Sequence, residues 1–252
     1  MSFPALKHVV IVGGGLAGAR CCEQLRRQGH EGRITLVGAE QHAPYDRPPL
    51  SKDVLLDKRD ETSLDIDFEA LSVNARLGVA ATGLRAVDRV LCTTTGEVPY
   101  DGLIIATGAD PVRLPGDGPQ WTVRTLEDAI AVRSRLTPGA RVVLIGASWI
   151  GAEIASAALA RGCEVTCLEA GDAPLAAALG SAVGARLLPW WDGVDLRLNS
   201  PVERVADGGV LLADGAMVPA DLVVSGVGVR PVTGWLHGSE LEADCGVVVD
   251  EW

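Results

Sequence analysis

Residues 9–18 read VVIVGGGLAG, an apolar run that leads directly into a G-x-G-x-x-G pattern. The run at 9–12 is typical of a strand buried in a parallel sheet. A helix is predicted over 19–29, and ITLV at 34–37 predicts the next strand. A glycine pattern is specific only in such a strand–turn–helix–strand setting, so this region predicts a dinucleotide-binding unit. The alternative is a glycine-rich turn that serves packing alone.

Each glycine of this turn has a physical task. Gly13 forms the tight turn, Gly15 lets the backbone approach a pyrophosphate, and Gly18 lets the helix pack closely against the strand. The phosphates then meet the unpaired N–H groups at the positive end of the helix dipole. Glu40, shortly after the second strand, can accept a hydrogen bond from a ribose hydroxyl.

The same order of elements returns later in the chain. VVLI at 142–145 predicts a strand, GASWIG at 146–151 nearly repeats the glycine turn, and a helix at 152–161 and a strand at 164–168 follow. We interpret this as a second mononucleotide unit. Its middle glycine is replaced by Ser148, whose side chain either crowds a pyrophosphate or donates a hydrogen bond to it.

Glu169 ends the last strand of this second unit. Its carboxylate would accept a hydrogen bond from a ribose 2′-OH and would repel a 2′-phosphate. No arginine lies in residues 170–173 to receive that phosphate. The second unit therefore favours NAD over NADP.

The composition excludes several classes of protein. A chain of 252 residues makes one large or two ordinary domains, and its apolar content of 48% supports a buried core. The net charge of −11 argues against binding nucleic acid through a broad basic surface. No apolar run reaches membrane-spanning length and residues 1–7 lack a signal pattern, so we expect a cytoplasmic protein without a membrane partner. The six cysteines form neither C-x-x-C nor a zinc spacing, so we expect no metal site and interpret them as small buried residues.

A proline-rich loop, APYDRPPLSK at 43–52, follows the first unit. Its prolines stiffen the backbone around Arg47 and Lys52, and Arg47 suits a phosphate because its planar fork pairs with oxygen atoms. The alternative is a solvated basic loop. Ser51 is expected to cap a short helix that runs through Leu56.

The remaining elements are assigned from the same signals. A helix over 126–136 is predicted to begin after Thr125, with Asp128 in the capping-box position, and a linker rich in Pro, Gly and Asp precedes it at 111–119. Another helix is expected over 174–191. Further strands are expected within 76–87 and at 89–93, 98–100, 103–105, 194–198, 202–206, 210–212, 222–225 and 247–249.

Five more motifs complete the pattern: PYDRPPLSK at 44–52, ATG at 106–108, RTLEDA at 124–129, WIGAE at 149–153 and GVGVRP at 226–231. Together with the two glycine turns, they make the chain similar to the FAD- and NAD(P)-dependent pyridine nucleotide-disulfide oxidoreductase superfamily. Within it, the chain resembles the ferredoxin reductase branch, the NADH-dependent reductases that serve Rieske oxygenases and cytochrome P450 systems. The resemblance spans essentially all 252 residues, and the proline-rich loop is its most branch-specific motif.

The resemblance implies an α/β fold with two Rossmann-like, three-layer dinucleotide-binding domains. The FAD-binding domain would take residues 1–112, the NAD-binding domain 113–235 would be inserted in it, and the chain would return to the FAD domain at 236–252. Family members continue into a segment ending in a Gly-Asp pair, whose Asp binds the ribityl chain of the flavin, and then into a C-terminal interface domain. We therefore expect a C-terminally truncated reductase with an incomplete FAD site.

The resemblance also implies two sets of cofactor-binding residues. Those for FAD would be Gly13, Gly14, Gly15, Leu16, Ala17, Gly18, Glu40, Arg47, Lys52, Ala81, Ala106, Thr107, Gly108 and Arg124. Those around NADH would be Gly146, Ser148, Trp149, Ile150, Gly151, Glu153, Glu169 and Gly228. Trp149 would be the aromatic residue that can cover the flavin when nicotinamide is absent.

Lys52 and Glu153 are the catalytic residues that the resemblance implies. Lys52 would lie near N5 of the flavin and favour electron density there, with Glu153 approaching it across the gap between the domains as a counter-ion. The alternative is two unrelated surface charges. NADH would stack on the flavin and pass a hydride to N5, because the protein aligns cofactors that carry the reactivity themselves.

The partner expected from the resemblance is a [2Fe-2S] ferredoxin that takes single electrons from the flavin. Disulfide reductases of the superfamily hold a redox-active cysteine pair beside the flavin, whereas residues 41–52 contain no cysteine. Two other readings stay open. One is an inactive nucleotide-binding fragment, and the other is a flavoprotein that reduces a quinone or dioxygen.

Overall fold

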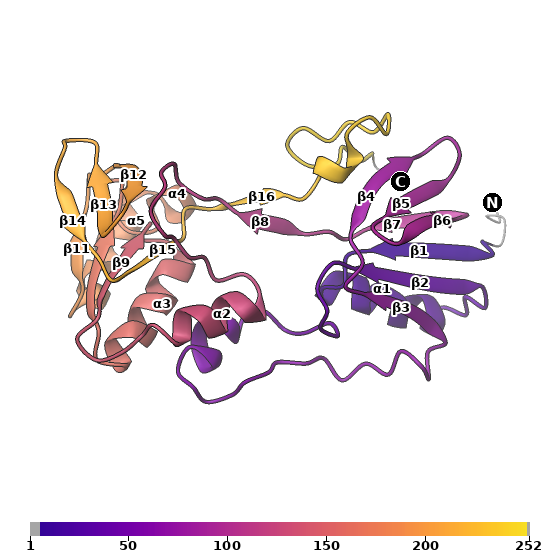
Figure 1. The fold of residues 1–252 in the computed structure, drawn as a ribbon, viewed down its shortest axis with the longest axis horizontal. Helices are drawn as coiled ribbons and strands as arrows, with labels where there is room; N and C mark the ends of the chain where they lie inside the picture. Colours follow the sequence, from indigo (N-terminus) through magenta and orange to yellow (C-terminus); the bar gives the residue numbers. More distant parts are fainter. Residues whose placement is uncertain (1–5, 251–252) are drawn as a thin grey trace. The chain divides into compact units, whose positions relative to one another are not determined.

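The chain folds into two compact units, each built on a parallel sheet (Figure 1). The computed structural model describes residues 6–250. Unit 1 comprises Met1–Asp46, Ser63–Asp110 and Arg230–Trp252, and unit 2 comprises Arg47–Thr62 and Pro111–Val229. Most of unit 2 is therefore inserted between two parts of unit 1, and the α/β class with two Rossmann-like sheets is confirmed.

Unit 1 has three layers. Its central sheet has the order β3-β2-β1-β7, all parallel, from β1 (His8–Val12), β2 (Arg33–Gly38), β3 (Val73–Leu77) and β7 (Gly102–Ile105). Helix α1 (Leu16–Arg27) covers one face, where Val9, Ile11 and Cys22 share a buried cluster. An antiparallel sheet of β4 (Ala81–Arg85), β5 (Val90–Thr93) and β6 (Gly96–Pro99) covers the other face. The two sheets share a second buried cluster, to which η3 (Gly234–Leu236) also contributes.

Unit 2 repeats this plan. Its parallel sheet has the order β11-β10-β9-β15, from β9 (Arg141–Ile145), β10 (Glu164–Leu168), β11 (Asp195–Arg197) and β15 (Leu222–Ser225). Helix α3 (Trp149–Ala160) packs against β9 and β10, and an antiparallel sheet of β12 (Val202–Ala206), β13 (Gly209–Leu212) and β14 (Met217–Pro219) shares a core with β9. Helix α2 (Leu126–Arg133) begins with the expected capping box of Thr125 and Asp128.

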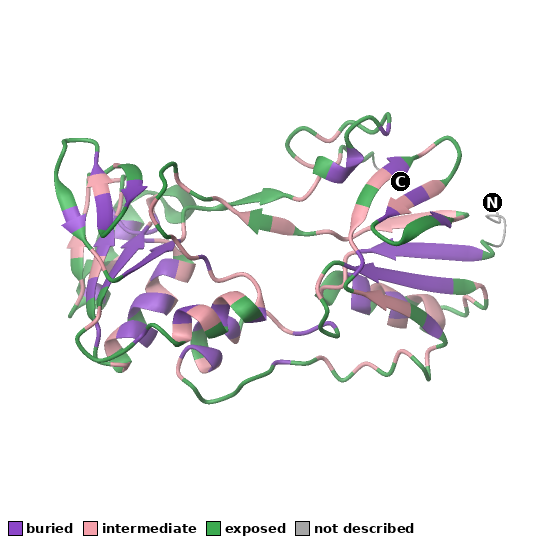
Figure 2. Cartoon of the chain, in the orientation of Figure 1, coloured by how far each residue is buried: buried purple, intermediate pink, exposed green. Residues whose placement is uncertain are grey.

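The burial of the strands follows from these layers (Figure 2). Both strands that lead into the glycine turns are buried almost throughout, since each lies between two neighbouring strands with a layer on either face. At the places where the chain passes between the units lie β8 (Ala109–Pro111) and β16 (Val229–Pro231), which form a two-stranded sheet. Among residues 6–250, no helix combines the length and the apolar character that a membrane span requires.

Three sequence expectations about elements are wrong. The region 174–191 is not one helix but α4 (Ala176–Leu179), α5 (Ser181–Gly184) and the 3-10 helix η2 (Ala185–Trp191), because Gly180 has a φ of 79° and Pro189 lies inside the last turn. Within the described part of the chain, residues 247–249 form no strand, and the N–H of Val248 donates instead to the carbonyl oxygen of Glu242 at 2.9 Å. Ser51 caps no helix, because the segment forms a single π-helical turn, η1 (Leu50–Val54), with Pro49 at its N-cap.

Candidate functional site

The glycine turn of unit 1 lies between the end of β1 and the start of α1. A Cβ atom on Gly13, whose φ is 119°, would lie 2.0 Å from the carbonyl oxygen of Ala106, and one on Gly18 would lie 2.0 Å from that of Gly13. A Cβ on Gly15 would meet nothing within 4 Å. Gly13 and Gly18 are therefore required for packing, whereas Gly15 borders open space where a ligand could contact the backbone, as the sequence predicts.

The N-terminus of α1 is suited to an anion. Gly15 is its N-cap, no side chain caps it, and its first turn contains no acidic residue. Leu16 and Ala17 are exposed, so the first N–H groups of the helix lie near solvent. A Cβ on Gly14 would lie 3.2 Å from the Cα of Gly38, at the end of β2. The turn thus has the shape and polarity that a pyrophosphate requires.

Glu40 follows β2, and a residue of the proline-rich loop holds it. The hydroxyl of Tyr45, whose residue is only 6% exposed, donates a hydrogen bond to a carboxylate oxygen of Glu40. The sequence by itself indicates no role for Tyr45 beyond its place in the motif. The contact fixes the direction of the carboxylate that is predicted to bind a ribose.

The segment after β7 serves the fold of unit 1 as well as its predicted site. The backbone oxygen of Ala106 packs so closely against Gly13 that no side chain fits there, and Thr107 Oγ1 donates to the carbonyl oxygen of Val232 at 2.8 Å. Gly108, with a φ of 69°, accepts from the N–H of Val232 at 3.0 Å. Ala81, at the start of β4, is partly buried and packs against the cluster that the two sheets of unit 1 share.

The glycine turn of unit 2 follows β9 in the same way, but a side chain occupies its middle position. Ser148 is the N-cap of α3, where its Oγ accepts from the N–H of Gly151 at 3.2 Å and donates to the carbonyl oxygen of Gly226 at 2.8 Å. A Cβ on Gly151 would lie 2.2 Å from the carbonyl oxygen of Gly146. The hydroxyl of Ser148 is thus used by the protein itself, and it links the turn to the end of β15.

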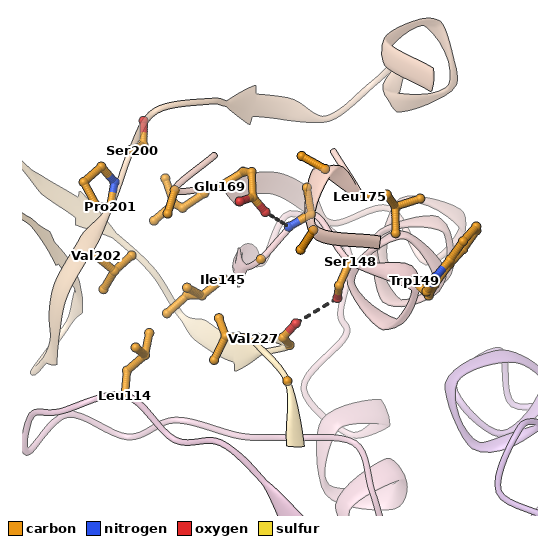
Figure 3. Close-up of a pocket in the computed structure, with 18 of the residues that line it drawn as sticks. Leu114, Ile145, Ser148, Trp149, Glu169, Leu175, Ser200, Pro201, Val202 and Val227 are labelled. Carbon is orange, nitrogen blue, oxygen red and sulfur yellow. Dashed lines mark hydrogen bonds between the residues drawn. The ribbon is translucent and has the colours of Figure 1, made fainter. Parts of the chain in front are cut away.

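A cavity of about 440 Å³ opens beside this turn, at the carboxyl ends of β9, β10 and β15 (Figure 3). Apolar side chains such as Ile145, Val202 and Val227 line most of it, and Glu169 is the one charged residue among the described residues of its lining. Its size and its few polar groups are typical of a small-molecule site at the edge of an α/β sheet. Of the predicted NADH residues, Gly146, Ser148, Trp149, Glu169 and Gly228 line it.

The carboxylate of Glu169 is held by backbone groups of its own unit. One oxygen accepts from the N–H of Ala147 at 2.7 Å and the other from the N–H of Gly171 at 2.8 Å (Figure 3 shows the first). Each carboxylate oxygen has a second lone pair, so both can still accept from a ribose. The two contacts orient Glu169 at the wall of the cavity.

Lys52 and Glu153 form the expected ion pair, with Lys52 Nζ 2.9 Å from Glu153 Oε1. Both residues belong to unit 2, so the expectation that they meet from different domains is wrong. The physical reason is that η1 packs against α2 and α3 of unit 2. Lys52 Nζ also donates to the carbonyl oxygen of Pro48 at 3.1 Å, and the hydroxyl of Ser51 donates to Glu153 Oε2.

Four further residues that were predicted to bind a cofactor also belong to unit 2. Arg47 Nη1 donates to the carbonyl oxygen of Arg124 at 2.6 Å, so these two FAD candidates contact each other. Trp149, at the start of α3, is 60% exposed, and Ile150 beside it is partly buried. Part of the cavity lining could not be predicted from the sequence, because these residues follow no motif and come together only through the fold: Leu114, Leu175, Ser200, Pro201 and Val202.

Known proteins share this architecture. A family model described as pyridine nucleotide-disulphide oxidoreductase matches residues 7–252. The ferredoxin–NAD(+) reductase component of the p-cumate 2,3-dioxygenase system of Pseudomonas putida is 37% identical, over 98% of this chain and 64% of its own length. The crystal structure of Fdr9 is 60% identical with a TM-score of 0.96, covering 97% of this chain and 62% of that one. In the covalent putidaredoxin reductase–putidaredoxin complex, a chain 32% identical has a TM-score of 0.91, covering 98% of this chain and 64% of that one.

The chain spans 64%, 63% and 63% of the lengths of three curated relatives, all ferredoxin–NAD(+) reductase components or subunits of dioxygenase systems. These similarities confirm the predicted family and the resemblance to its ferredoxin reductase branch.

Proposed function

Because the chain belongs to the pyridine nucleotide-disulphide oxidoreductase family, we propose that it forms the FAD- and NADH-binding part of an NADH:ferredoxin oxidoreductase. One observation carries the proposal. Two glycine turns, each between a buried parallel strand and a helix, are each followed at the end of the next strand by an oriented carboxylate, Glu40 or Glu169. Two such units in one chain suit two different dinucleotides.

The residues of unit 1 fit FAD, because Gly15 borders open space that a side chain would fill and the N-terminus of α1 has no acidic residue. Gly13 to Gly18 would hold the pyrophosphate and Glu40 a ribose. In unit 2 the cavity beside Ser148 would take NADH, with Glu169 on its adenosine ribose. Bound together, the cofactors supply the chemistry, a hydride from NADH to N5 of the flavin and then single electrons to a carrier protein.

Lys52 and Glu153 are the residues proposed to tune this chemistry. Lys52 would place a positive charge near the flavin and favour its electron-rich form, and Glu153 would hold that charge in place. The proposed partner is a small iron–sulfur electron carrier, specifically a [2Fe-2S] ferredoxin. The names of relatives that are ferredoxin–NAD(+) reductase components, and the lack of a cysteine pair in residues 41–52, support this proposal.

The test begins with purified protein, FAD and an anaerobic absorbance measurement. We expect a bound flavin spectrum that bleaches when NADH is added, and much slower bleaching with NADPH. A protein that takes up no FAD under these conditions would favour the alternative of a nucleotide-binding fragment. Cytochrome c reduction that depends on added [2Fe-2S] ferredoxin would support the proposed partner, whereas equal reduction without it would favour a quinone or dioxygen as acceptor.

A further inference from the structure

We propose that Ser51 is a positioning residue, whose hydroxyl fixes the carboxylate of Glu153 so that Glu153 fixes the ammonium group of Lys52. The inference rests on the proposed function, in which Lys52 acts electrostatically on a flavin. The contacts that carry it lie within unit 2. Ser51 Oγ donates to Glu153 Oε2, and Lys52 Nζ lies 2.9 Å from Glu153 Oε1, so the two oxygens of one carboxylate have different partners.

Burial distinguishes the two partners of Glu153. Ser51 is 3% exposed, whereas the side chains of Lys52 and Glu153 are 50% and 34% exposed. An ion pair this exposed is weak, because water competes for both charges and both long side chains lose rotamer freedom on pairing. The buried Ser51 side chain is restricted by the close packing around it, and a hydrogen bond from its hydroxyl to a charged acceptor is stronger than one to a neutral acceptor.

The π-helical turn η1 explains how adjacent residues reach the same carboxylate. It buries Ser51 and exposes Lys52, and the carbonyl oxygen of Pro48 restrains the ammonium group from another side at 3.1 Å. Glu153 lies in the first turns of α3, directly after the glycine turn. Ser51 therefore sets the direction of the carboxylate from the interior, and Lys52 follows it at the surface.

The loop that carries Ser51 has other anchors, so the hydroxyl is not needed to keep it in place. Arg133 Nη1 on α2 lies 3.0 Å from Asp57 Oδ1 and 2.9 Å from Asp60 Oδ1. At the other end of the loop, Arg47 Nη1 bonds to the backbone of Arg124. Removal of the Ser51 hydroxyl should therefore loosen Glu153 and Lys52 without releasing the loop.

The first test needs no flavin. The chain has three lysines, Lys7, Lys52 and Lys58, so the ammonium signals in ¹H–¹⁵N spectra are few and the other two are internal references. We expect Ser51→Ala to give the Lys52 ammonium faster proton exchange and greater mobility, and Ser51→Thr to restore the wild-type signal. Ser156→Ala is the matched control, because Ser156 Oγ donates to the carbonyl oxygen of Ala152 within α3, away from Glu153 Oε2. Unchanged Lys52 dynamics in Ser51→Ala would overturn the proposal.

The second test uses the FAD-loaded protein. Ser51→Ala should slow flavin reduction by NADH about fivefold, the effect of losing roughly one hydrogen bond, and should add no further loss in a Glu153→Ala background. Full additivity of the two substitutions, or amide exchange showing that residues 47–62 detach in Ser51→Ala, would make Ser51 a structural residue only and overturn the proposal. If the protein binds no FAD, the proposed function fails, while the lysine spectra still decide the role of Ser51.

Discussion

Gly15 and Ser148 occupy equivalent positions in the two glycine turns and solve different physical problems. Gly15 leaves the N-terminus of α1 without a side-chain cap and borders open space. Ser148 caps α3 and bonds to Gly226, so its turn is stabilised by the protein itself. The unit 1 turn therefore has free donors for a ligand, whereas the unit 2 turn has fewer and lies beside a formed cavity.

Single glycine substitutions separate packing from ligand binding in the unit 1 turn. Gly15→Ala should reduce the free energy of unfolding by less than about 1 kcal/mol, since alanine is only a poorer N-cap than glycine, yet abolish FAD binding. Gly18→Ala should cost about 3 kcal/mol, because its Cβ would lie 2.0 Å from the backbone oxygen of Gly13. Urea unfolding and flavin absorbance measure both quantities. Equal destabilisation by the two variants would contradict this division of roles.

In unit 2, hydrogen bonds and an ion pair join the beginnings of two strands, β9 and β15. Arg141, the first residue of β9, forms a two-pronged contact with Asp221, which precedes β15: Nε to Oδ2 is 3.0 Å and Nη2 to Oδ1 is 2.6 Å. The N–H of Arg141 also donates to Asp221 Oδ2 at 2.9 Å. These hydrogen bonds from Arg141 lower the pKa of Asp221 to about 2.

The lowered pKa of Asp221 predicts a pH dependence of stability. A carboxyl group whose folded pKa is depressed stabilises the fold above its unfolded pKa, and that contribution disappears as the pH falls through the folded pKa. The stability difference between the wild type and Asp221→Asn should thus be constant above about pH 4 and shrink towards about pH 2. Urea titrations at several pH values measure it. Because the pair is exposed, the difference should be small and should decrease in salt. A difference that grows on acidification would contradict the assignment.

At the scale of the whole molecule, each compact unit is made of segments that are separate in the sequence. Residues 47–62 follow the first glycine unit in sequence but belong to unit 2, together with residues 111–229. Arg133 of α2 is the centre of this attachment, since its largely buried side chain, 17% exposed, pairs with Asp57 and Asp60. The attachment of residues 47–62 to unit 2 therefore brings Lys52 and Glu153 into one unit, although 101 positions separate them.

Loss of the Arg133 guanidinium should release this segment. Arg133→Leu keeps most of the aliphatic volume but leaves Asp57 and Asp60 without their ion pair, so limited proteolysis within residues 55–62 should become several-fold faster. Arg204→Leu is the control, because the Arg204 Nη1 to Asp117 Oδ1 distance is a long 3.8 Å. Equal cleavage rates in the wild type and Arg133→Leu would show that packing of η1 alone holds the segment.

The sequence predicted most strands, both glycine turns and the capping box of α2, because these features depend on neighbouring residues. It failed at 174–191, where the helical composition is interrupted by the backbone of Gly180 and by Pro189, and at 247–249, where apolar residues form no strand in the described part of the chain. It also gave Ser51 a capping role, whereas the π-helical turn directs its hydroxyl to Glu153.

The amino-acid order alone determined the two strand–glycine turn–helix units and the acidic residue after each, since hydrophobic periodicity and glycine geometry act over a few residues. It also supplied both members of the Lys52–Glu153 pair, through the likeness to a family. Only the tertiary structure decided that the pair lies within one unit, that Ser51 and Tyr45 orient the carboxylates of Glu153 and Glu40, and that Ser148 turns towards Gly226. The reason is that these contacts join residues distant in sequence, and their geometry is set by packing between elements.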